Sequence, residues 1–396
     1  MGSKLQFYEF FAGGGMARAG LGSSWKCLFA NDFDGKKALT YQNNWGTQGE
    51  LFVGDIRNIQ VGDLTGTADL AWGSFPCQDL SLAGDGAGLA GNRSGTFYPF
   101  WDVMRKLALV GRVPQIIVLE NVCGTLTSHG GADFRAICKT FADEGYNFGA
   151  VVIDAVLFLP QSRPRIFFIG IRKNLDFPDY LTCSGPVAPF STSGLRNAFE
   201  GLSAELKSSW IWWNLPKPPA RASRLADILE EFPSDVTWNT DKQTNCIVEM
   251  MSETNLAKVN AAKRTGRKMV GGVYKRTRVE GNKRVVRAEV RFDDVAGCLR
   301  TPNGGSSRQT ILIVHRQKLR SRLLSARETA RLMGLSDKYK LPKNYNEAYH
   351  LTGDGVSVPV VRFLSENLFE PLLGRDNKAW DSGFAKLGSK AKIFGH

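Results

Sequence analysis

The sequence has no uninterrupted apolar run of the roughly 18 residues that a membrane-spanning helix needs. Its start, Met1-Gly2-Ser3-Lys4, also lacks the charged and then apolar order of a signal peptide. We therefore expect a protein that remains in the cytoplasm, where it is made, and that has no membrane as a partner.

Residues that build metal sites or disulfide frameworks are also scarce. The seven cysteines are widely spaced and include no C-x-x-C pair, and only four histidines accompany them. This composition indicates a reducing compartment and no bound metal. The chain shows no internal repeat, and its 396 residues exceed what one hydrophobic core usually supports. We expect two domains of unequal size, each present once.

Acidic residues are outnumbered, with 38 Asp and Glu against 51 Lys and Arg, which gives a net charge of +13. Such an excess favours an acidic polymer as a partner, because Lys and Arg release counterions from phosphates when they bind. Charge alone does not separate nucleic acid from an anionic membrane. Much of the excess lies in residues 258–291, which carry Lys263, Arg264, Arg267, Lys268, Lys275, Arg276, Arg278, Lys283, Arg284, Arg287 and Arg291 against only Glu280 and Glu289.

The first part of the chain, to about residue 172, repeats a short apolar run, a turn with Gly or Asp, and a longer helical pattern. This rhythm predicts an α/β domain with a parallel sheet of buried strands. The expected strands are residues 6–10, 26–31, 51–54, 70–73, 116–120, 150–156 and 165–171. Residues 132–143 have the spacing of a helix.

After about residue 177 the regular rhythm ends. Prolines interrupt the chain and three tryptophans gather, so a second, irregular domain is expected. Regular structure returns with an amphipathic helix at residues 325–333, where Ser325 is the predicted N-cap and Glu328 completes a capping box. A last apolar helix is expected at about residues 358–373.

A glycine-rich turn, Phe10-Phe11-Ala12-Gly13-Gly14-Gly15-Met16, follows the first expected strand and permits close approach of a cofactor. NAD and FAD enzymes use similar turns. The next two strands end in Asn31-Asp32-Phe33 and Gly54-Asp55-Ile56. The first acid can bind ribose hydroxyls, its aromatic neighbour can stack on adenine, and the second acid can accept from the adenine amino group. A single such acid is more typical of a solvated turn, but together they indicate an adenosyl pocket.

Three further segments carry reactive side chains. Gly73-Ser74-Phe75-Pro76-Cys77-Gln78-Asp79-Leu80-Ser81 places Cys77 at the carboxyl end of the fourth strand, where α/β active sites lie. Val118-Leu119-Glu120-Asn121-Val122 places Glu120 at the same edge. Gln161-Ser162-Arg163-Pro164-Arg165 presents two guanidinium groups on one face of an extended segment. An isolated cysteine is more typical of a structural role, so it is the combination that indicates an active site.

Four of these motifs are the glycine-rich turn, the Pro-Cys-Gln loop, the Glu-Asn-Val tripeptide and the Gln-x-Arg-x-Arg segment. In this order and at about these separations, they resemble the motifs of the DNA cytosine-5 methyltransferase family of the prokaryotic restriction–modification type. The resemblance runs from end to end. Residues 324–334 resemble the helix that bounds the family's recognition domain, and residues 353–358 resemble its final cofactor-contacting segment. In that segment this chain has Asp354 where Asn is commonest.

The resemblance implies a Rossmann-like S-adenosylmethionine-dependent methyltransferase domain with a mixed, mostly parallel sheet, formed by residues 1–184 and 346–396. It also implies a smaller, irregular target-recognition domain, which together with its hinge spans residues 185–345. The cofactor would be S-adenosyl-L-methionine and the product S-adenosyl-L-homocysteine. Its expected contacts are Phe11, Ala12, Gly13, Gly15, Met16, Asp32, Phe33, Asp55, Ile56, Pro76, Phe97, Asp354, Gly355 and Val356.

The resemblance also implies a mechanism on a cytosine turned out of the duplex. The Cys77 thiolate adds to carbon 6, and a protonated Glu120 donates to nitrogen 3. Arg165 holds oxygen 2, and Arg163 supports either the cysteine loop or the backbone. Carbon 5 then accepts the methyl group, after which the carbon-5 proton and Cys77 leave. The expected DNA contacts are Gln78, Ser81, Lys283, Arg284, Arg287 and Arg308, with residues 300–308 as a second backbone-contacting segment.

Three other functions remain open from the residues. A tRNA cytosine-5 methyltransferase would share the motifs, although the long basic insert favours a DNA reader. A DNA-binding regulator without catalysis would not need Cys77, Glu120 and both arginines. An NAD-dependent oxidoreductase explains only the glycine turn. We expect a monomer of bacterial or phage origin, whose partners are double-stranded DNA and a restriction endonuclease that acts on the same site without direct contact.

Overall fold

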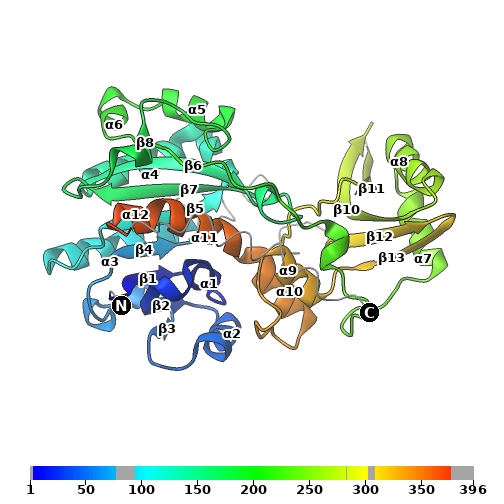
Figure 1. Cartoon of the computed structure of the whole chain (residues 1–396), viewed down its shortest axis with the longest axis horizontal. Helices are drawn as coiled ribbons and strands as arrows, with labels where there is room; N and C mark the ends of the chain where they lie inside the picture. The colour runs from blue at the N-terminus through cyan, green and yellow to red at the C-terminus, as the bar shows by residue number, and fades with distance from the viewer. Residues whose placement is uncertain (1–2, 77–93, 282, 302–307, 376–396) are drawn as a thin grey trace.

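The chain forms a larger α/β lobe and a smaller lobe built on an antiparallel sheet (Figure 1). The computed structural model describes residues 3–76, 94–281, 283–301 and 308–375. The expected contacts Cys77, Gln78 and Ser81 lie outside these residues. Within them, no helix has both the length and the apolar character to span a membrane.

The larger lobe contains a seven-stranded sheet with the order β3-β2-β1-β4-β5-β7-β6. Its strands are β1 (Leu5–Phe10), β2 (Trp25–Asp32), β3 (Leu51–Val53), β4 (Leu70–Gly73), β5 (Ile116–Val122), β6 (Tyr146–Asp154) and β7 (Pro164–Arg172). All seven expected strands are confirmed, with shifted ends.

The sequence rhythm predicted a wholly parallel sheet. This prediction is wrong at β7, which runs antiparallel to both β5 and β6. The connection from β6 to β7, residues 155–163, is too short for the crossover that a parallel pair needs, so the chain reverses there. The mixed, mostly parallel sheet implied by the family resemblance is confirmed.

Helices cover both faces of this sheet. They are α1 (Met16–Leu21), α2 (Gly35–Trp45), α3 (Phe97–Leu109), α4 (Ala132–Asp143) and α11 (Val358–Leu364), which continues through a π-helical turn (Ser365–Phe369) into α12 (Glu370–Leu372). Alternate residues of β5 point to opposite faces. Val118 packs in the cluster with α1 and α11, whereas Ile117 and Leu119 pack in the cluster with α3 and α4.

The tryptophan-rich middle segment also packs on the larger lobe. It contains β8 (Thr182–Cys183), α5 (Ser193–Glu200), α6 (Ala204–Ser208) and β9 (Trp212–Trp213). The ring centroid of Trp210 lies 5.7 Å from that of Phe148 in β6 and 6.0 Å from that of Phe134 in α4. This packing places the beginning of the segment expected to form the second domain, residues 185–345, against β6 and α4 of the larger lobe.

The smaller lobe has a four-stranded antiparallel sheet with the order β11-β10-β12-β13. Its elements are α7 (Asp241–Glu249), α8 (Glu253–Arg264), β10 (Lys268–Glu280), β11 (Lys283–Arg291), β12 (Thr310–His315) and β13 (Lys318–Leu323). One face packs on α7 and α8 through Val273, Val290 and Leu312. On the other face, Val270 and Ile311 join the hydrophobic cluster of the larger lobe.

The chain returns to the larger lobe through α9 (Ala326–Leu332) and α10 (Tyr345–Asp354). The predicted capping box is confirmed: Ser325 Oγ accepts from the Glu328 backbone N–H at 3.1 Å, and Glu328 Oε2 accepts from the Ser325 N–H at 2.8 Å. Asp235 adds a second carboxylate, which accepts from the Ala326 N–H at 2.8 Å. Acidic groups suit a helix N-terminus because its N–H groups point outward there.

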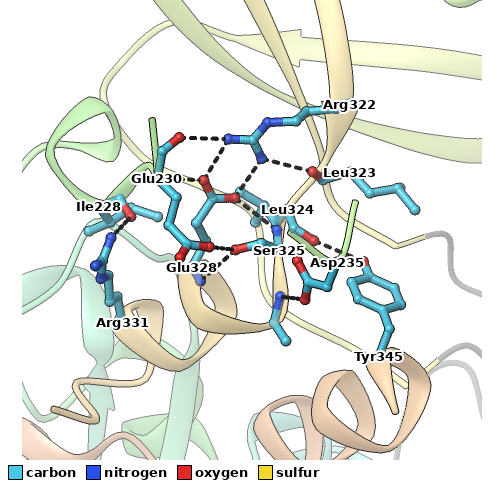
Figure 2. A network of polar contacts seen from close by, with 11 residues as sticks. Ile228, Glu230, Asp235, Arg322, Leu323, Leu324, Ser325, Glu328, Arg331 and Tyr345 are labelled. Atoms are coloured by element: carbon cyan, nitrogen blue, oxygen red, sulfur yellow. Dashed lines mark hydrogen bonds and ion pairs between the residues drawn. The ribbon is translucent and has the colours of Figure 1, made fainter. Parts of the chain in front are cut away.

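A buried ion pair joins β13 to this helix end (Figure 2). Both guanidinium NH groups of Arg322 lie 2.7 Å from the carboxylate oxygens of Glu328, and both side chains are almost fully buried. Glu230, from the segment that enters the smaller lobe, donates its N–H to Glu328 and accepts from Arg322 and Ser325. Three segments of the joint between the lobes therefore share one polar network.

Replacing Arg322 with methionine should lower the free energy of unfolding by about 3–5 kcal/mol, because it leaves the Glu328 carboxylate buried without its cation. Urea denaturation measures the change. Arg105→Met is the matched control, since Arg105 forms its ion pairs at the surface and should cost about 1 kcal/mol or less. Equal losses in the two variants would contradict a structural role for the buried pair.

Candidate active site

The glycine-rich turn after β1 is held by Asp32 at the end of β2. Asp32 Oδ2 accepts from the Gly13 backbone N–H at 2.7 Å, and Oδ1 accepts from the Asp34 N–H at 2.9 Å. Burial raises the pKa of this carboxyl group, while Lys37 opposes the shift. Asp32 is therefore buried and links the glycine turn to the residues before α2. It is not a solvated turn residue.

The turn is also fixed from outside. The Gly14 carbonyl accepts from Trp45 Nε1 at 3.0 Å and from the Tyr339 hydroxyl at 2.8 Å. A Cβ atom on Gly14 would lie 2.2 Å from that hydroxyl, and Gly15 has a φ of 78° that favours glycine. The close packing explains why glycines occupy these positions.

The C-terminal segment at residues 353–356 lies beside this turn. Asp354 Oδ2 pairs with Lys37 Nζ at 2.7 Å. A Cβ atom on Gly355 would lie 2.2 Å from Met16 Sδ, and Val356 is buried in the same cluster as Met16. Met16, Gly355 and Val356, which are far apart in the sequence, are therefore brought together as expected for one pocket.

The other expected cofactor residues differ in exposure. Phe33 is 77% exposed, so its ring is open to a ligand, and Asp55 accepts from the Arg57 N–H at 2.9 Å. Ile56 and Phe97 are buried, and the Phe97 ring centroid lies 5.5 Å from that of Phe75. Phe11, Ala12 and Pro76 are buried or half-buried at the carboxyl ends of β1 and β4.

Glu120 and Arg165 form an ion pair at the carboxyl end of β5. The register pairs Val122 with Arg165, and Arg165 Nε lies 3.1 Å from Glu120 Oε1. Both side chains are largely buried. A carboxyl and a guanidinium group thus lie side by side at the edge where the Pro-Cys-Gln loop begins. The neighbouring Asn121 holds the Phe75 carbonyl at 3.3 Å, two residues before Cys77.

Arg163 has a different environment from Arg165. Its guanidinium is buried and donates to the carbonyls of Leu299, Gly353 and Gly355 at 2.9, 2.8 and 2.7 Å. Burial and the nearby Arg165 lower its pKa. Of the two roles considered for Arg163, these contacts favour support of the backbone. Gln161 acts similarly, since it donates to the Leu332 carbonyl and accepts from the Leu299 N–H.

The sequence did not identify two titratable groups near this edge. Cys298 accepts from Arg163 NH1 at 3.4 Å; burial opposes ionisation, but Arg163, Arg165 and Arg300 together lower the pKa of its thiol. Glu9 lies beneath the glycine turn, where Oε1 accepts from the Arg18 N–H at 3.2 Å and Oε2 lacks a hydrogen-bond partner among the described residues. Burial raises the pKa of Glu9 to about 8. The burial and the neighbours of Cys298 and Glu9 come from contacts between different elements of the fold, so no local sequence pattern indicates them.

The sheet and its covering helices have the fold of known methyltransferases. The structure of the Entamoeba histolytica methyltransferase EhMeth aligns with a TM-score of 0.60 and 14% identity over 94% of this chain and 99% of that chain. The type II methyltransferase M.NlaX of Neisseria lactamica is 26% identical over 369 residues, which cover 92% of this chain and 96% of M.NlaX.

A second relative is similar over a shorter region. The type II methyltransferase M.Bsp6I of Bacillus sp. (strain RFL6) is 34% identical over 183 residues, so the match covers 44% of this chain and about half, 56%, of M.Bsp6I. The family model for the C-5 cytosine-specific DNA methylase matches residues 5–370. The chain belongs to the C-5 cytosine-specific DNA methylase family.

Glu9→Gln should weaken the pH dependence of stability. The native Glu9 carboxyl keeps its proton to about pH 8, whereas an unfolded one loses it near its ordinary pKa of 4.5. The native state therefore binds more protons in this interval, and its stability falls as the pH rises. Glutamine has no such proton, so unfolding free energies measured from pH 5 to 8 should fall less steeply. Glu205→Gln, at the surface, should leave the slope unchanged, and an unchanged slope in Glu9→Gln would contradict the assignment.

Proposed function

We propose that this protein is a DNA (cytosine-5-)-methyltransferase that transfers a methyl group from S-adenosyl-L-methionine to carbon 5 of a cytosine flipped out of a specific double-stranded DNA sequence. The observation that carries the proposal is the Glu120–Arg165 pair, which lies at the edge of the sheet where the Pro-Cys-Gln loop begins, in a chain that belongs to this family. Adjacent polar groups of this kind can bind the hydrogen-bonding edge of a pyrimidine base.

The residues around the glycine turn fit S-adenosyl-L-methionine. Gly13 has open space where a Cβ would lie, Asp32 supplies carboxylate oxygens, and Phe33 offers an exposed aromatic face. Met16 and Gly355 pack against each other next to the turn. When bound, the cofactor supplies an electrophilic methyl group on a sulfonium. The buried clamp of Arg163 on Gly353 and Gly355 keeps the last segment beside the turn.

The proposed chemistry begins with Cys77. Its thiolate adds to carbon 6 of the cytosine, because carbon 5 is a poor nucleophile until that bond forms. Glu120 in its protonated form donates to nitrogen 3, where electron density arrives, and Arg165 donates to oxygen 2. These two side chains lie 3.1 Å apart, which suits the ring nitrogen 3 and the neighbouring exocyclic oxygen 2 of one base. After methyl transfer, loss of the carbon-5 proton expels Cys77 and restores the aromatic ring.

The smaller lobe is proposed to bind DNA. Lys283 and Arg284 are exposed near the β10–β11 turn, and Arg287 is half-buried beside Glu280. Arg308 lies over the ring of Tyr345 and contacts Asn346, so it is already oriented. The relatives M.Bsp6I and M.NlaX are named type II methyltransferases. We further propose a bacterial restriction–modification role for this chain, with a cytoplasmic monomer and an endonuclease that acts on the same site independently.

Cys77→Ser should abolish methyl transfer, because a serine hydroxyl is a far weaker nucleophile than a thiolate, while cofactor binding remains. Transfer of labelled methyl groups to duplex DNA and calorimetric titration with S-adenosyl-L-homocysteine measure the two properties. Cys246→Ser, which changes an exposed cysteine on α7, is the control and should keep both. Normal turnover in Cys77→Ser would exclude the mechanism.

Alanine at Lys283, Arg284 and Arg287 together should weaken DNA binding and reduce the slope of log K against log salt concentration by up to about 3, or about 0.9 for each lost phosphate contact. Fluorescence anisotropy with a duplex at several salt concentrations measures the slope. A triple variant with the original slope would place the DNA elsewhere. Binding of tRNA in preference to duplex DNA by the unchanged protein would point to an RNA substrate.

A further inference from the structure

The hairpin of β10 and β11 extends beyond the rest of its sheet. The pairing of β10 with β12 ends at Val273, whereas its pairing with β11 continues to Glu280. Residues 274–280 and 283–289 therefore form a two-stranded ribbon, whose base is also joined to Met251 by an isolated bridge at Ala288. At about 3.3 Å per residue, this ribbon is roughly 23 Å long. Figure 1 shows β10 and β11 beyond β12, on the side of the smaller lobe that carries α8.

The two faces of the ribbon are distinguished by the alternation of side chains along each strand. Val270 and Gly272 share a face with Tyr274, Arg276 and Arg278. Val270 packs in the hydrophobic cluster of the larger lobe, whereas Val273, on the opposite face, packs with α7 and α8. The Tyr274 face therefore belongs to the side of the sheet where the larger lobe and the Glu120–Arg165 pair lie.

Most charged side chains on this face are already engaged. Arg278 pairs with Glu289, and Arg287 pairs with Glu280 through an Nε to Oε1 contact of 2.7 Å. Each pair joins the two strands and so braces the ribbon. The hydrogen bond from Arg287 lowers the pKa of the surface residue Glu280. For Glu289 burial opposes ionisation, but hydrogen bonds with Tyr274 and Arg278 lower its pKa.

Arg276 differs from its neighbours. Its guanidinium lies 4.9 Å from the centroid of the Tyr274 ring and makes no ion pair with a described residue. Stacking on an aromatic ring restrains a guanidinium without using its hydrogen-bond donors. The side chain is exposed, so its donors are available to a partner on this face.

We propose that the ribbon enters the major groove of B-form DNA beside the target cytosine, and that Arg276 reads a guanine there. This inference rests on the proposed function. The major groove is about 12 Å wide and admits a two-stranded ribbon, and arginine is the side chain that most often binds guanine O6 and N7 in a bidentate manner. Because Arg278 and Arg287 are paired with glutamates, Arg276 is the arginine on this face whose guanidinium is available to bind a base. The deep, narrow major groove of A-form RNA would not admit such a ribbon.

The test compares Arg276→Ala and Arg276→Lys with Arg264→Ala. Arg264 is also exposed, but it lies on α8, on the opposite face of the sheet, so it controls for loss of one positive charge. Each protein methylates a library of duplexes with randomised sequence, and bisulfite sequencing gives the preference at every position. Circular dichroism and binding of S-adenosyl-L-homocysteine establish that each variant is folded.

We expect the unchanged protein and Arg264→Ala to share one motif. In Arg276→Ala and Arg276→Lys, the preference for one guanine in that motif should fall about 10- to 100-fold, because lysine keeps the charge but not the bidentate geometry. A lower rate with the motif intact in both variants would show that Arg276 contacts phosphate only, and would overturn the inference while leaving the proposed function standing. No methylation of DNA by the unchanged protein would overturn both.

Discussion

The buried guanidinium of Arg163 joins parts of the chain that are far apart in sequence. It donates to the carbonyls of Leu299, Gly353 and Gly355, so the connection between β11 and β12 and the end of α10 meet at the start of β7. A buried cation with several carbonyl partners is costly to leave unsatisfied. This constraint holds the last segment against Met16, at the start of the helix that follows the glycine turn.

The same logic extends to the joint between the lobes. Glu328 closes the N-terminus of α9 and binds Arg322 of β13, and Glu230 bonds to both (Figure 2). The position of the smaller lobe is thus tied to a helix of the larger one. For a protein proposed to turn a base from the duplex into a pocket, a defined distance is required between the ribbon proposed to bind DNA and the proposed catalytic edge, since small displacements of reacting groups are costly.

Local patterns predicted much of this structure. The seven strands of the larger lobe are short apolar runs with turn residues, and the Ser325–Glu328 capping box needs only four consecutive residues. The reversal of β7, the packing of Trp210 on Phe148, and the carbonyl partners of Arg163 depend on contacts between distant segments, which no local pattern records. Of the candidate site, the neighbouring positions of Glu120 and Arg165 agree with the expectation, whereas the roles of Cys77, Gln78 and Ser81 remain predictions outside the described residues.

Bisulfite sequencing of plasmid DNA tests whether this chain methylates cytosine in duplex DNA through Cys77. The plasmid comes from cells that lack other cytosine methylation and that express either the unchanged protein or Cys77→Ser. We expect protected cytosines within one short recurring sequence, with the unchanged protein only. Full conversion of every cytosine by bisulfite, despite expression of the folded protein, would contradict it.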